Sequence, residues 1–103
     1  MRDAKHGRLM LDLAGTDIQA MTHMMDSDKF SESVFGFHCQ QAVEKLCKAW
    51  LSAEGAEYPR THDLRTLMQL LEHRRPREIG VFLPLVDLTD YAVQFRYDAP
   101  IDP

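Results

Sequence analysis

Polar side chains recur every three or four residues near the middle of the chain, at His38, Gln41, Lys45 and Lys48. On a helix these four positions fall within about 80° of one another and form a single stripe. Imidazole, amide and ammonium groups so placed could hold an anion, a phosphate or a polynucleotide backbone. The same spacing also fits a solvated flank, in which Glu44 and Lys48 form an ordinary i,i+4 pair and His38 is a boundary histidine. The spacing alone leaves both interpretations open.

The stripe lies on a helix that we expect to run from about Ser31 to Ala53. Gly55 predicts the end of this helix, because glycine readily adopts the left-handed conformation that follows a helix C-terminus. Beside the stripe, apolar residues repeat at helical intervals and predict a core face: Phe35, Cys39, Ala42, Val43, Leu46, Ala49, Trp50 and Ala53.

An earlier helix is expected over residues 8–25 and a third over residues 61–73, with Thr61 as the N-cap of the third. The earlier helix has apolar residues on one face: Met10, Ala14, Ile18, Met21 and Met25.

A fourth helix is expected from Phe82 or Pro84 to about Arg96, with two apolar lines along it. One line is enough for a solvent-facing helix, so the second favours contact with another chain. Four helices with short connections predict an all-α fold, an antiparallel up-and-down four-helix bundle, as one domain over residues 1–103.

The bulk composition narrows the function classes. The chain has 103 residues and a net charge of −4, which argues against a general nucleic-acid coat, so no DNA partner is expected. Cys39 and Cys47 lie about 12 Å apart along one predicted helix, too far for a disulfide, and no spacing of zinc ligands occurs. No metal or cofactor is therefore expected. No signal-peptide pattern or membrane-length apolar run is present, so a cytoplasmic protein with no membrane contact is expected.

Three segments together resemble the motifs of one family. Residues 37–49 read FHCQQAVEKLCKA, residues 59–64 read PRTHDL, and residues 88–98 read LTDYAVQFRYD. They are similar to the "FHAQQAAEKxLKA", "PRTHDL" and "LTxYAVxxRYPD" segments of HEPN domains, helical domains often encoded beside minimal nucleotidyltransferases. The resemblance runs from about Arg8 to Asp98, which is nearly the whole chain.

This resemblance implies a bundle of four or five helices that usually pairs as a homodimer. It also implies a regulatory or toxin–antitoxin role with a minimal nucleotidyltransferase as partner, and a nucleotide or RNA phosphate as ligand. Relatives usually continue into another helix after the last motif, so the final family helix is expected to be missing. The residues expected around a phosphate or partner site are His38, Gln41, Lys45, Arg60, His62, Asp63 and Arg96.

Some relatives are metal-independent ribonucleases that use an Arg followed by a His after four to six residues. Here Arg2 and His6 have three residues between them, and Arg65 and His73 have seven. We therefore assign no catalytic residue and expect a binding protein. Two alternatives stay open, a ribonuclease toxin of the same family and a purely structural dimerisation module.

Overall fold

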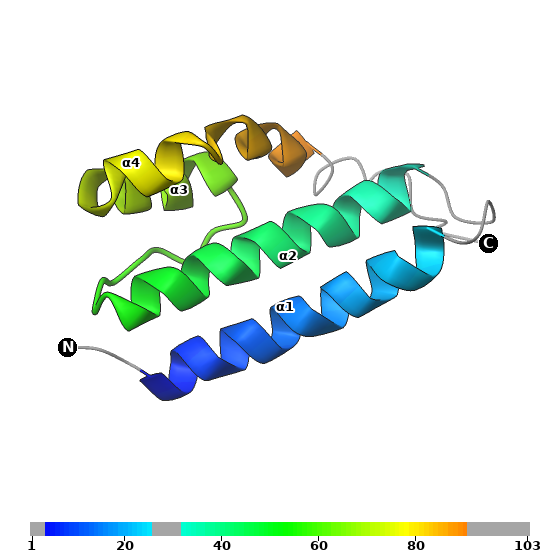
Figure 1. Ribbon diagram of the computed structural model, residues 1–103, viewed down its shortest axis with the longest axis horizontal. Coiled ribbons are helices and arrows are strands. Elements are labelled where there is room, and N and C mark those ends of the chain that lie inside the picture. The colour runs from blue at the N-terminus through cyan, green and yellow to red at the C-terminus, as the bar shows by residue number, and fades with distance from the viewer. Residues whose placement is uncertain (1–3, 26–31, 91–103) are drawn as a thin grey trace.

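A computed structural model describes residues 4–25 and 32–90 of the chain. Within these ranges every regular element is helical: α1 (Ala4–Met25), α2 (Glu32–Ala53), α3 (Leu64–Arg74), α4 (Pro76–Gly80) and the short 3₁₀ helix η1 (Leu83–Leu88). Figure 1 shows α2 in the middle, with α1 along one side and α3, α4 and η1 along the other. The predicted all-helical class is confirmed for this part of the chain. None of the described helices has the length and apolar character that a membrane span requires.

The direction of α3 departs from the expected up-and-down order. Helices α1 and α2 run antiparallel, but the connection over residues 54–63 then turns back along α2 (Figure 1). His62 lies beside Glu44 in the middle of α2, whereas Arg75, just after α3, bonds Glu54 just after α2. Helix α3 therefore runs parallel to α2, because this connection is long enough to cover several turns of helix before α3 begins.

The end of α2 follows the predicted glycine stop. Gly55 has a φ of 76°, which is the left-handed conformation that glycine adopts at little cost. The Gly55 N–H donates to the Ser52 carbonyl at 3.1 Å, and the Ala56 N–H donates to the Leu51 carbonyl at 2.9 Å. These two bonds form a Schellman motif, which satisfies carbonyls left open at the end of the helix.

Helix α3 begins at Leu64, and its N-cap is Asp63 rather than the expected Thr61. The Asp63 carboxylate accepts from the Arg65 N–H at 2.9 Å. The Thr61 hydroxyl instead accepts from the Asp63 N–H at 3.0 Å and so shapes the turn before the helix. Thr and Asp both suit an N-cap position. Asp63, two positions after Thr61, is the cap because it has the extended backbone of an N-cap residue.

The short helix α4 was not predicted and precedes the expected fourth helix, which begins as the 3₁₀ helix η1. Pro76 starts α4, and Pro84 lies in the first turn of η1, where its missing N–H costs little. Residues 89–90 return to α-helical geometry, and the remainder of the expected helix, including Arg96, lies outside the described residues.

The main core lies between α2 and the α3–α4–η1 layer. Its buried members come from three helices: Cys47, Leu51, Leu64, Leu67, Met68, Leu71 and Ile79.

On the other side of α2, α1 packs through small residues. A Cβ atom added at Gly7 would lie 3.4 Å from the Ala49 carbonyl oxygen, and Ala14 is fully buried. Ile18 and Met25, expected on the inner face of α1, are exposed instead.

Candidate functional site

Asp17 of α1 is a buried carboxylate that binds two side chains of the α2 stripe. Its Oδ1 lies 2.9 Å from His38 Nδ1, and its Oδ2 lies 2.6 Å from Lys45 Nζ. An ionised carboxylate can only accept, so His38 carries a proton on Nδ1 and donates it to Asp17. The three groups join α1 to α2 by charge-assisted hydrogen bonds in a site where water is largely excluded. Asp17 retains only 7% of its accessible surface.

Glu44 of α2 is the second buried carboxylate, and it binds the segment that leads to α3. Lys48 Nζ donates to Glu44 Oε2 at 2.8 Å, and Gln40 Nε2 donates to Glu44 Oε1 at 2.8 Å. His62 Nδ1 lies 3.1 Å from both oxygens. The Gln40 amide also donates to the His62 carbonyl at 3.0 Å, so these bonds hold the connection against the middle of α2.

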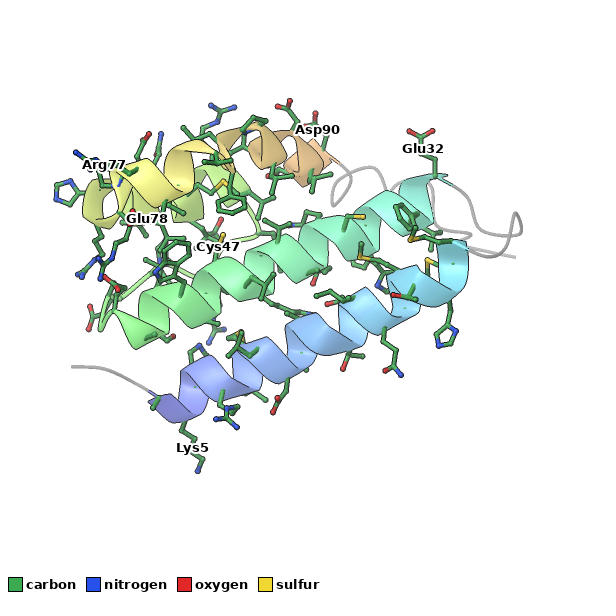
Figure 2. All side chains as sticks on the ribbon, in the orientation of Figure 1. Lys5, Glu32, Cys47, Arg77, Glu78 and Asp90 are labelled. Carbon is green, nitrogen blue, oxygen red and sulfur yellow. The ribbon has the colours of Figure 1, made fainter. Side chains whose placement is uncertain are left out.

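The titration of these groups follows from their surroundings. Burial raises the pKa of Glu44, but hydrogen bonds from Lys48, Gln40 and His62 outweigh it and leave the pKa below its ordinary value. Burial, and then the negative charge of Glu44, raises the pKa of Cys47 to about 11. Cys47 is consequently a protonated, buried thiol at neutral pH and has no nucleophilic character. Figure 2 shows its side chain on the face of α2 that is turned toward α3 and α4.

The six expected site residues that the structure describes divide into three groups. His38 and Lys45 are bound to Asp17, and His62 is bound to Glu44. Gln41 donates to the side-chain oxygen of Gln40 at 2.7 Å, and Asp63 caps α3. Arg60 is exposed, and its side chain makes no ion pair or hydrogen bond within the described ranges. Arg96 lies outside them. The structure therefore binds the charged residues of the stripe to internal carboxylates, and Arg60 makes no bond to that network.

Sequence reasoning missed the role of both carboxylates as anchors. Asp17 lies three residues after Ala14 and four before Met21, on the predicted apolar face of α1, and an acid at such a position is a signal for a buried partner. Glu44 was assigned only the pair with Lys48. Glu44 lies on a second face of α2, on which buried residues repeat every three or four positions: Gln40, Glu44, Cys47 and Leu51.

An apolar hollow of about 250 Å³ lies between α2 and the α4–η1 side of the molecule. It is lined by eight residues: Val43, Leu46, Cys47, Trp50, Met68, Ile79, Phe82 and Leu85. Leu46 and Phe82 are 41% and 47% exposed, and the neighbouring Val81 is 77% exposed. Clustered exposed apolar residues of this kind mark surfaces that another molecule covers.

Among the described residues, no group of three or more His, Cys, Asp or Glu side chains could hold a metal ion.

Comparison with known proteins identifies the family to which the chain belongs. The family model described as the HEPN domain matches residues 8–102, nearly the whole chain. No curated protein and no solved structure matches the chain. The three motifs noted in the sequence lie inside the matched range, and the first two contribute Glu44, Lys45 and His62 to the networks above. The chain belongs to the HEPN domain family.

Proposed function

We propose that this HEPN-domain protein is the docking and regulatory member of a nucleotidyltransferase–HEPN pair of the toxin–antitoxin type, acting in the cytoplasm. The observation that carries the proposal is the apolar hollow beside α2, where Leu46, Val81 and Phe82 are exposed together. Exposed aromatic and aliphatic residues around a hollow suit the anchors of a protein partner. The choice of a minimal nucleotidyltransferase as that partner rests on family membership.

The internal contacts of the α2 stripe favour a binding surface elsewhere on the protein. His38 and Lys45 already pair with Asp17, so a phosphate at this part of the stripe would have to compete with a buried carboxylate for them. His38 and His62 bond different carboxylates, one toward α1 and the other toward the connection before α3. A ribonuclease centre built on these two histidines therefore gains no support from the geometry.

A second apolar surface supports pairing with another copy of the chain. Leu11, Ile18 and Met25 follow one another at intervals of seven residues along α1, and all three are exposed. Such heptad spacing places them on one line, as in helices that pair with helices. Homodimerisation through α1 would leave the hollow on the opposite side of α2 open to the nucleotidyltransferase.

A nucleotide or RNA phosphate is part of the same proposal. Arg60 supports it, because an exposed guanidinium with no partner among the described residues is available to bind an anion bidentately.

Phe82→Asp should weaken binding of a minimal nucleotidyltransferase from the same genome roughly thirty-fold, by about 2 kcal/mol, because a charge would replace an apolar anchor. Co-expression and affinity co-purification give the first readout, and titration calorimetry of the two purified proteins gives the affinity. The matched control is Leu9→Asp, which places the same charge at an equally exposed apolar position on α1. If wild-type protein and nucleotidyltransferase do not associate, or both variants bind as the wild type does, the docking proposal is wrong.

A further inference from the structure

A second hollow lies where the start of α1 meets the connection before α3. It has a volume of about 360 Å³ and is lined by His6, Met10, Lys48, Tyr58 and Arg60. Three separate segments contribute to it, namely α1, α2 and residues 56–60, so folding is required to bring its polar groups together. Of these residues, Arg60 belongs to the site expected from sequence, and Lys48 is the last residue of the α2 stripe.

Four of the five residues that line this hollow carry a cationic or hydrogen-bonding side chain, and the fifth is Met10. None of its described lining residues is acidic, although the whole chain has a net charge of −4. Glu44 does not line the hollow but contacts Lys48, and its oxygens already accept from Lys48, His62 and Gln40. Glu44 offsets the charge of Lys48, whereas Arg60 is exposed and has no partner among the described residues, so Arg60 gives the hollow a surplus of positive charge that attracts anions.

The donors are arranged by contacts within the protein. Lys48 Nζ lies 5.9 Å from the centre of the Tyr58 ring, and one of its N–H groups donates a hydrogen bond to Glu44 Oε2 at 2.8 Å. An ammonium group has three donors, so two remain for a ligand. The Tyr58 hydroxyl is hydrogen-bonded to His6 Nε2, which fixes both groups at the edge of the hollow. Lys48 and Tyr58 are therefore held in place before any ligand binds, which reduces the entropy cost of binding.

Arg60 completes the donor set. Its guanidinium offers a planar fork that matches two oxygens of a phosphate, whereas Lys48 offers a point charge. A phosphate monoester carries up to two negative charges and three acceptor oxygens, which suits one fork and one ammonium. The Tyr58 hydroxyl adds a third donor in the tautomer in which His6 Nε2–H donates to the hydroxyl oxygen. The volume is at the lower end of small-molecule sites, which is enough for one nucleotide rather than a folded polymer.

We propose that His6, Lys48, Tyr58 and Arg60 form a binding site for a phosphate monoester, of the kind that a nucleoside 5′-phosphate carries. The proposal rests on the nucleotide-binding part of the proposed function and is independent of the protein-docking part. It places the phosphate site at the Lys48 end of the stripe, at the opening between α1 and the connection, and away from Lys45, which is bound to Asp17.

Titration calorimetry of the full chain with adenosine 5′-monophosphate, inorganic phosphate and adenosine tests this site. The two phosphates should bind competitively and more weakly as salt is raised, and adenosine should bind at least tenfold more weakly than its monophosphate. Arg60→Ala should weaken binding of the monophosphate at least tenfold, and Arg60→Lys should restore part of it. Arg65→Ala is the control, because Arg65 is an exposed arginine on α3 that does not line the hollow.

Three results would overturn the proposal. The first is that neither phosphate binds. The second is that Arg60→Ala binds the monophosphate as tightly as Arg65→Ala, which would leave nucleotide binding intact but place it elsewhere. The third is that adenosine binds as well as its monophosphate. Each of them leaves the docking proposal unaffected, because that proposal is judged by nucleotidyltransferase binding.

Discussion

Replacing Asp17 with Asn is expected to lower the free energy of unfolding by about 3 kcal/mol, because it removes the buried negative charge that Lys45 and His38 share. The side chain keeps its shape, so the loss reports charge rather than volume. Lys45 would be left part-buried beside a neutral amide, and the contact between α1 and α2 would lose its strongest polar link. Chemical denaturation followed by circular dichroism measures the effect.

Asp12→Asn is the matched control, since Asp12 is an exposed acid on the same helix and its loss should change stability by less than about 0.5 kcal/mol. Lys45→Met combined with Asp17→Asn should be less destabilising than the sum of the two single changes, because both charges then leave together. Equal effects of Asp17→Asn and Asp12→Asn would show that the buried carboxylate does not link the two helices.

Glu44→Gln is expected to destabilise the protein by about 3 kcal/mol at neutral pH and by much less in acid. The folded-state pKa of Glu44 is depressed below its ordinary value of 4.5, because hydrogen bonds from Lys48, Gln40 and His62 outweigh the effect of burial. A depressed carboxyl pKa adds stability that is fully present above the unfolded-state value and is lost as the pH falls through the folded-state value. The difference between wild type and variant should therefore shrink below about pH 4.5.

Urea denaturation at a series of pH values from neutral to acid measures this dependence. Glu57→Gln is the control, since Glu57 is an exposed glutamate in the connection and its removal should leave the pH profile of stability unchanged. A constant difference between wild type and Glu44→Gln across the series would contradict the ionised, hydrogen-bonded state of Glu44.

The helices and the family could be predicted well from the sequence. Apolar spacing placed the expected helices close to the observed α1 and α2, and Gly55 marked the end of α2 because only a left-handed residue closes that motif cheaply. The direction of α3 could not be predicted. It depends on His62 reaching back to Glu44, a contact between residues eighteen positions apart that no local pattern encodes.

The candidate site was predicted only in part. Spacing correctly grouped His38 and Lys45, but it could not show that a buried acid from another helix binds both of them. The two hollows could not be predicted from the sequence for the same reason, because each is lined by residues from separate segments that packing brings together. The anchoring role of Asp17 could be predicted from the sequence, because an acid on an otherwise apolar helix face requires a partner.

The most direct test of the docking proposal is hydrogen–deuterium exchange of the protein alone and with a minimal nucleotidyltransferase bound. The amides of residues 43–50 and 79–86, which carry most of the lining of the apolar hollow, should exchange more slowly in the complex, while those of α1 should change little. Protection confined to α1, or no protection at either segment of the hollow, would contradict docking at this surface.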